Sequence, residues 1–166
     1  MNARLQGPAA PQAPRAQPPE VRLEPLSLER LDAVLAIENV AYSHPWSRGN
    51  FMDTLAAGYQ AQVLLGGDEV IGYYVAMLGV DEAHLLNLTV APAFQQQGWA
   101  RVLLDALGLW ARARGAQWLW LEVRVSNLRA QKIYAAHGFQ RVGVRKRYYP
   151  AAGSTREDAL VMSLRL

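Results

Sequence analysis

One glutamate stands in a sequence context that could make it a proton acceptor. In the run "WLWLEVRV", residues 118–125, strand alternation places Trp118, Trp120, Glu122 and Arg124 on one face and aliphatic side chains on the other. Glu122 would then share its face with two indole rings, and partly apolar surroundings raise the pKa of a carboxyl group and make it a better base near neutral pH. A structural ion pair with Arg124 or another basic residue is the alternative, and the alternation does not decide between the two.

A glutamine-rich turn is the second stretch that could bind a ligand. "QQQGWAR", residues 95–101, lies where a predicted strand joins a predicted helix. The first turn of a helix presents unpaired N–H groups and the positive end of the helix dipole, so this turn could hold a phosphate or pyrophosphate. Gly98 and Ala100 allow close approach to the backbone, and Arg101 adds a charge. A tight connection with solvent-facing glutamines explains the turn equally well, and the glycine spacing of P-loops and dinucleotide sites is absent.

Tyr134 falls with Ala130, Ile133 and His137 on one face of a predicted helix. Packing in the core is the simplest interpretation of that spacing. A phenol is an unusual choice for filler alone, because a buried hydroxyl needs a hydrogen-bond partner. Asn127, near the start of the same helix, is a candidate cap.

The chain contains no cysteine and three histidines. Without cysteine there is no disulfide, no thiolate zinc site and no covalent acyl-cysteine intermediate. The histidines, His44, His84 and His137, are scattered without the spacing of metal ligands, so we expect no metal site.

These side chains require a framework, and 166 residues is about the length of one domain. Residues 1–20 contain five prolines and no aromatic residue, which predicts a disordered tail ahead of a domain at residues 21–166. The formal charge of +3 is ordinary for a solvated surface. Prolines interrupt any signal peptide, and no apolar run approaches the roughly 20 residues that span a bilayer. We therefore expect a soluble, cytoplasmic protein.

Apolar periodicity and turn residues predict the order of elements. Strands are expected near residues 21–26, 60–80 as a hairpin turning at 66–68, 84–91, 116–125, 139–149 and 157–166; helices are expected after Ser27, after Ser47, at about 98–114 and at about 127–137. The order is strand, two helices, three strands, helix, strand, helix, two strands. It predicts an α/β domain with a mixed sheet covered by helices.

Several motifs resemble those of one enzyme family. Gln95-x-x-Gly98-x-Ala100 after a "LTV" strand is similar to the coenzyme A pyrophosphate loop of the GNAT superfamily of acetyl-CoA-dependent N-acetyltransferases. Six further motifs resemble the ribosomal-protein-alanine N-acetyltransferases, called RimI. In chain order they are "HPWS", "LLNLTV", "WLEVRVSN", "IYAAHGF", "RKRYYP" and "EDALVM". The resemblance covers about residues 21–166. Trp99 and Ala100 replace the leucine and glycine that are usual there, and the tail has no counterpart.

The resemblance implies a GNAT-type mixed central β-sheet of about six to seven strands flanked by about four helices. It implies acetyl-CoA as co-substrate, Glu122 as general base and Tyr134 as the acid that protonates the departing thiolate. The cofactor contacts that it implies are Leu88, Thr89, Val90, Gln96, Gln97, Gly98, Trp99, Ala100, Arg101 and Asn127. Because cysteine is absent, the acetyl group would pass directly from coenzyme A to the amine in a ternary complex.

The acceptor amine is limited by its pKa. Deprotonation at pH 7 costs about 1 kcal/mol for an α-amine and about 4.6 kcal/mol for a lysine, which favours an N-terminal amine. The resemblance implies the N-terminal alanine of a small-subunit ribosomal protein, with Trp46, Tyr148 and Tyr149 as candidate walls of the peptide groove; ordinary packing explains these rings equally well. Lysines or small amines are alternative acceptors. A non-enzymatic module that binds ribosomal RNA would need a clustered basic face, and the chain offers only the short run 145–147.

Overall fold

The computed structural model describes residues 20–166, so the tail predicted at residues 1–20 lies outside the described residues except for its last position. The described part forms a seven-stranded sheet with the order β1-β2-β3-β4-β5-β7-β6. The strands are β1 (Val21–Pro25), β2 (Gln60–Gly66), β3 (Glu69–Leu78), β4 (Glu82–Val90), β5 (Trp118–Arg124), β6 (Gln140–Pro150) and β7 (Arg156–Arg165). Four α-helices accompany them, α1 (Leu31–Ala41), α2 (Arg48–Ala56), α3 (Trp99–Ala113) and α4 (Leu128–His137), with short 3-10 turns η1 (Leu28–Arg30) and η2 (Pro92–Phe94).

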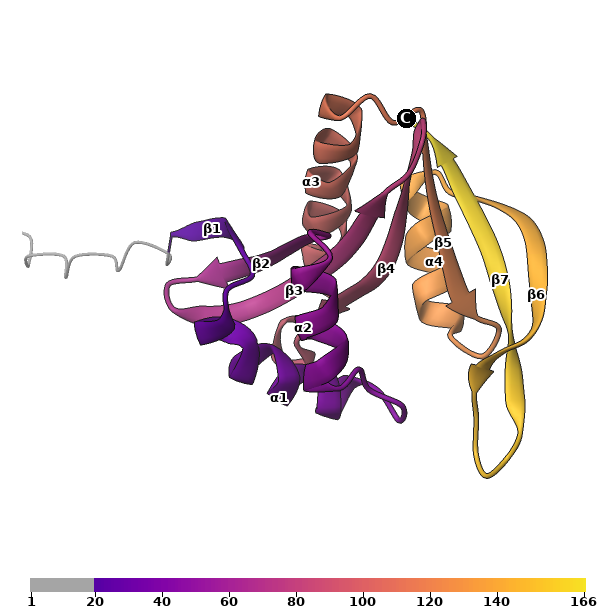
Figure 1. Ribbon diagram of the computed structural model, residues 1–166, viewed down its shortest axis with the longest axis horizontal. Coiled ribbons are helices and arrows are strands. Elements are labelled where there is room, and N and C mark those ends of the chain that lie inside the picture. The colour runs from indigo at the N-terminus through magenta and orange to yellow at the C-terminus, as the bar shows by residue number, and fades with distance from the viewer. Residues whose placement is uncertain (1–19) are drawn as a thin grey trace, which may run out of the picture.

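The predicted fold class and the predicted order of elements are confirmed (Figure 1). Neighbouring strands are antiparallel except β4 and β5, which run parallel, so the sheet is mixed as expected. In the part of the chain that the structure covers, no helix is long and apolar enough to cross a membrane.

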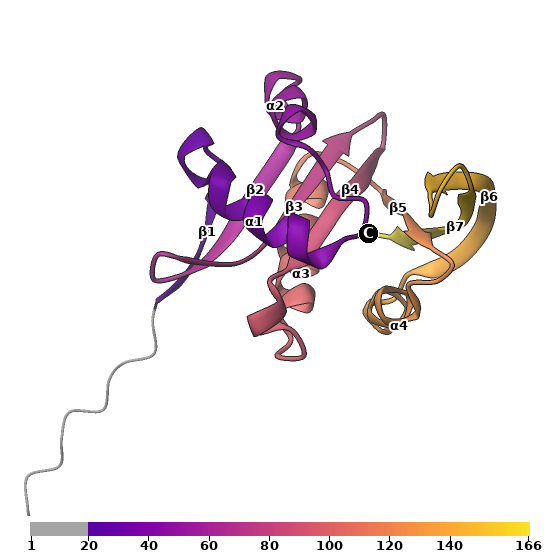
Figure 2. The same ribbon diagram turned by 90° about the horizontal axis from the view of Figure 1, so that it is seen from below.

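Helices cover both faces of the sheet. Figure 2 shows α1 and α2 on one side and α3 and α4 on the other. Leu31, Val34 and Phe51 pack in the α1/α2 layer, and Leu103 and Leu107 pack against β3, β4 and β5 in the α3/α4 layer. Burial of these side chains removes apolar surface from water on both faces, which is the main force holding the layers together.

Side-chain caps begin two of the helices, including α4, which carries Tyr134. Asn127 Oδ1 accepts a hydrogen bond from Ala130 N at 3.1 Å at the start of α4. Ser47 caps α2 in a reciprocal pair with Asn50. Ser27 precedes the η1 turn without a side-chain cap bond, since the turn closes through Arg30 N and the Ser27 carbonyl. Ser27 is therefore at the N-cap position of the helical stretch expected after it, but its side chain does not cap the turn.

β4, in the middle of the sheet, contains a bulge near the point where its pairing with β5 ends. Val75 of β3 pairs with Asn87, but the next residue, Ala76, pairs with Leu85, so Leu86 is an extra residue in β4. Bulges bend a strand and redirect its side chains. The parallel pairing of β4 with β5 ends at Leu85. Beyond that point the two strands are no longer paired, and the sheet is open between them.

Candidate active site

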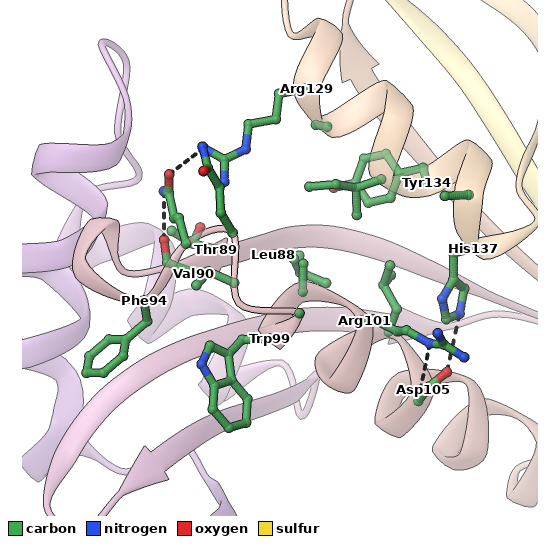
Figure 3. Close-up of a pocket in the computed structure, with 18 of the residues that line it drawn as sticks. Leu88, Thr89, Val90, Phe94, Trp99, Arg101, Asp105, Arg129, Tyr134 and His137 are labelled. Atoms are coloured by element: carbon green, nitrogen blue, oxygen red, sulfur yellow. Dashed lines mark hydrogen bonds and ion pairs between the residues drawn. The ribbon is translucent and has the colours of Figure 1, made fainter.

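A cavity of about 860 Å³ lies at this opening, on the α3/α4 side. Its walls are β4, the turn after β4, α3 and α4 (Figure 3). Nine of the ten predicted cofactor residues line it: Leu88, Thr89, Val90, Gln96, Gly98, Trp99, Ala100, Arg101 and Asn127. Gln97 does not, because its amide bonds to the Ala93 carbonyl and to the Trp99 indole. The size suits a small-molecule ligand.

The turn predicted to hold a phosphate opens into this cavity. Gly98 is the N-cap of α3 with φ of 88°, a left-handed conformation that glycine adopts without strain. A Cβ added there would have no atom within 4 Å, so the space in front of the helix is open. Trp99 N and Ala100 N, the first two N–H groups of α3, have no carbonyl partner within the helix and lie at the positive end of its dipole, whereas Arg101 N is bonded to the Gly98 carbonyl at 3.1 Å. The geometry fits an anionic group at the start of α3.

Tyr134 lies in the cavity wall near two further phenols. Figure 3 shows Tyr134 and His137 projecting from α4. The Tyr42 hydroxyl donates to the Leu88 carbonyl at 3.1 Å and contacts Thr89 Oγ1 at 2.9 Å. Burial, with smaller contributions from Tyr42 and Tyr149, raises the pKa of Tyr134 well above its usual value. At neutral pH Tyr134 is therefore protonated and able to donate a hydrogen bond.

Tyr42 and Tyr149 border the same opening. Burial raises the pKa of Tyr42 to about 12, although the Thr89 hydrogen bond opposes the shift. The Tyr149 hydroxyl donates to the Glu122 backbone carbonyl at 2.9 Å, and burial raises the pKa of Tyr149 as well. Sequence reasoning missed Tyr42, which follows α1 and carries no motif of its own.

Glu122 lies on the opposite face of the sheet and does not line the cavity. Leu121 and Val123 on either side of it are buried in the α3/α4 layer, so the predicted alternation of β5 is confirmed. Both carboxylate oxygens are occupied: His84 Nε2 lies 2.8 Å from Oε2, and Arg145 Nε lies 2.9 Å from Oε1. The side chain is 7% exposed.

The prediction of a raised pKa for Glu122 is wrong. Burial alone would raise the pKa, but the His84 hydrogen bond and charge, together with Arg145, outweigh burial and lower it. The alternative interpretation was an ion pair with Arg124 or another basic residue, and Glu122 does form an ion pair. Its partner is Arg145, because Arg124 instead pairs with Glu157 at 3.0 Å. Glu122 is thus an ionised carboxylate at neutral pH.

A second buried carboxylate, which sequence analysis missed, connects α1 to β4. Glu38 is 1% exposed and accepts hydrogen bonds from the Tyr73 hydroxyl, from Asn87 Nδ2 at 3.1 Å and from Trp46 N at 2.9 Å. Thr89 Oγ1 donates to Asn87 Oδ1 at 2.9 Å, which extends the network to the cavity wall. The available signal was periodicity, because Glu38 continues the apolar face of α1.

The three predicted groove residues do not line the cavity. Trp46 is partly buried and its ring lies 5.3 Å from that of Phe51, which is the packing alternative. Tyr148 is exposed and meets Tyr149 edge to face at 4.9 Å. These two rings border Glu122 rather than the cavity, since Arg145 lies over Tyr148 and the Tyr149 hydroxyl reaches the Glu122 carbonyl. Among residues 20–166, no group of three or more potential ligand side chains could hold a metal ion.

Comparisons with known proteins agree with this arrangement. The acetyltransferase (GNAT) family matches residues 31–139. A [ribosomal protein bS18]-alanine N-acetyltransferase from Haemophilus ducreyi is 40% identical over 144 residues, covering 87% of this chain and 99% of that protein. The crystal structure of the ribosomal-protein-S18-alanine N-acetyltransferase from Escherichia coli superposes with a TM-score of 0.80 at 34% identity, covering 88% of this chain and 94% of that one.

A more distant structure supports the fold alone. A GNAT family acetyltransferase from Elizabethkingia anophelis, solved with acetyl-CoA bound, has a TM-score of 0.71 at 21% identity and covers 88% of this chain and 98% of that one. With the family match spanning most of the described domain, this chain belongs to the acetyltransferase (GNAT) family and uses acetyl-CoA as its co-substrate.

Proposed function

We propose that this protein transfers the acetyl group of acetyl-CoA directly to the N-terminal α-amine of alanine in the small-subunit ribosomal protein bS18. The observation that carries the proposal is the opening between β4 and β5. It has a cavity on one side and the ionised carboxylate of Glu122 on the other. Two substrates could therefore meet through the sheet without a covalent enzyme intermediate. The choice of bS18 rests on relatives that bear this name at 36–40% identity.

The residues around the cavity fit coenzyme A. Leu88–Val90 pairs with β3 but has no strand partner on its β5 side, where its backbone could bind the pantetheine amides as a strand edge binds an extended peptide. The start of α3 would hold the pyrophosphate, with Arg101 adding charge and Asn127 bordering the arm. Bound acetyl-CoA supplies an activated acyl group, and the protein has to position it.

Proton transfer would be divided between the two faces. Tyr134, kept protonated by its raised pKa, would donate to the departing sulfur. Glu122, kept ionised by His84 and Arg145, would attract the acceptor ammonium and draw its proton. His84 is hydrogen-bonded to Glu122 at 2.8 Å and would hold the carboxylate in position.

We propose that the acceptor approaches from the Glu122 face, between Trp46 and the Tyr148–Tyr149 pair. Both segments border this face, and neither reaches the cavity. A ribosomal-protein substrate would place the reaction in the cytoplasm. We also propose that residues 21–166 are the catalytic unit.

Release of coenzyme A from acetyl-CoA tests the proposal. The acceptors are a peptide with the bS18 N-terminal sequence beginning with alanine, the same peptide with a blocked N-terminus, and a blocked peptide containing a free lysine. Release with only the free α-amine is expected. Release with the lysine peptide or with polyamines alone would reject the N-terminal assignment and leave the family membership intact.

A further inference from the structure

Arg129 is a charged residue at the rim of the cavity to which the proposed function gives no role. It is the second residue of α4, and its Nη1 donates a hydrogen bond to Gln95 Oε1 at 2.7 Å. The contact joins segments 34 residues apart, and both residues line the cavity. Figure 3 shows Arg129 extending from α4 toward the loop beside Val90. The pair bridges the α4 wall and the β4 wall.

The orientation of Gln95 makes this bridge specific. Gln95 Nε2 donates to the Val90 carbonyl at 3.0 Å. A carbonyl accepts only from the amide nitrogen, and a guanidinium donates only to the amide oxygen, so the two bonds agree on one orientation of the amide. The Gln95 side chain is held by the end of β4, and Arg129 is held by Gln95. This exposed hydrogen bond places the guanidinium beside the turn at residues 95–101.

The partner of Arg129 is neutral, which leaves its charge uncompensated. Within the described part of the chain no carboxylate lies within ion-pair distance of Arg129, whereas Arg101 in the same cavity lies 3.9 Å from Asp105. A guanidinium forms charge-assisted and often bidentate hydrogen bonds with phosphate, which are stronger than those with an amide. A phosphate at the 95–101 turn would compete successfully for it.

We propose that Arg129 is a specificity residue for the nucleotide end of acetyl-CoA. On binding, it exchanges Gln95 for a pyrophosphate oxygen and so joins α4 to the ligand at the start of α3. No covalent step is involved. The inference rests on the proposed function, in that it places the pyrophosphate at this turn.

Equilibrium binding tests the proposal without any acceptor amine. Dissociation constants are measured by calorimetry on the full chain for acetyl-CoA, for acetyl-dephospho-CoA and for S-acetylpantetheine, which ends in a hydroxyl in place of the pyrophosphate. The variants are Arg129→Gln, which removes the charge, and Arg129→Lys, which keeps it. Arg114→Gln is the matched control, because Arg114 is exposed at the end of α3 and does not line the cavity.

Arg129→Gln should weaken acetyl-CoA and acetyl-dephospho-CoA about tenfold and leave S-acetylpantetheine within about twofold. Arg129→Lys keeps the charge but not the paired N–H donors of the guanidinium, so it should recover part of the loss, and Arg114→Gln should change none of the three. Equal weakening of all three thioesters would mean that Arg129 acts only through the shape of the cavity and would overturn the proposal. So would a loss confined to acetyl-CoA, which would assign Arg129 to the 3′-phosphate.

The two proposals can fail separately. If wild-type protein binds acetyl-CoA no more tightly than S-acetylpantetheine, the pyrophosphate site is wrong and Arg129 loses its ligand. If binding behaves as expected but the bS18 peptide is not acetylated, the acceptor is wrong and the role of Arg129 stands.

Discussion

On the α3/α4 side of the β4–β5 opening, the cavity wall comes mainly from two stretches that are short in sequence, 88–105 and 127–137. Much of what this wall offers is backbone, at the edge of β4 and at the start of α3. On the α1/α2 side, the partners come from different elements: Glu122 of β5 pairs with His84 of β4, and Glu38 of α1 is held separately by Asn87 of β4. Backbone sites tolerate side-chain changes better than buried ionic networks do, so we expect single substitutions to be most damaging on the α1/α2 side.

The largest effect is expected at Glu122. Glu122→Gln keeps the size of the side chain and removes its charge, so kcat should fall about 100-fold or more, in the range of general-base contributions. The dissociation constant of acetyl-CoA should stay within about twofold, because Glu122 does not line the cavity. Steady-state kinetics with the alanine peptide and calorimetry provide the two readings. Glu69→Gln, at an exposed position on β3, is the control. A kcat equal to that of wild type would remove Glu122 as base.

Glu38 should matter most for folding. Glu38→Ala leaves the Tyr73 hydroxyl, the Asn87 amide and Trp46 N buried without their acceptor, which should lower the free energy of unfolding by about 3 kcal/mol. Glu38→Gln keeps an acceptor oxygen and should cost about 1 kcal/mol. Urea denaturation measures both. If the alanine variant lost less than the glutamine variant, the network would not be a stabilising one.

On the cavity side, Tyr134→Phe should lower kcat about 30-fold, within the range for loss of a general acid. Binding of acetyl-CoA should persist, because the ring and its packing against Phe139 remain. Tyr59→Phe, at a partly exposed residue before β2, is the control. Kinetics with a thioester whose thiol is a better leaving group should narrow the difference between Tyr134→Phe and wild type. An undiminished kcat would return Tyr134 to a packing role.

The same contrast explains what the sequence could predict. The 95–101 turn and the start of α3 follow from local signals, namely Gly98 and the period of the α3 apolar face, and Asn127 marks the start of α4 in the same way. The alternation of β5 likewise placed Glu122 on the correct face. Each of these features depends on neighbours within one or two turns of chain, and such neighbours are visible in one sequence.

The environment of Glu122 could not be predicted in this way. The lowered pKa depends on His84 of β4 and Arg145 of β6, which lie 38 residues before it and 23 residues after it in sequence. His84 approaches through the parallel pairing of β4 with β5, and Arg145 approaches through the placement of β6 beyond β7; neither arrangement has a local signature in the sequence. The sequence showed that Glu122 lies beside tryptophans, but it did not show the charges of His84 and Arg145, which oppose the effect of burial on the pKa of Glu122.

The smallest effect, and the most direct test of that environment, is a shift along the pH axis. Glu122 has a lowered pKa in the folded protein, so its contribution to stability is present above the ordinary carboxyl range and is lost as pH falls through the lowered value. His84→Ala removes the hydrogen bond and charge that oppose burial most strongly, so the pKa of Glu122 should rise. The acidic limb of the kcat/KM profile should then move to higher pH, with a smaller change in kcat at pH 8 than at pH 6.

His44→Ala, at an exposed histidine bonded only to Ser43, should leave the profile in place. A limb that stayed fixed in His84→Ala would mean that Arg145 alone sets the charge of Glu122, and Arg145→Gln would then have to move it.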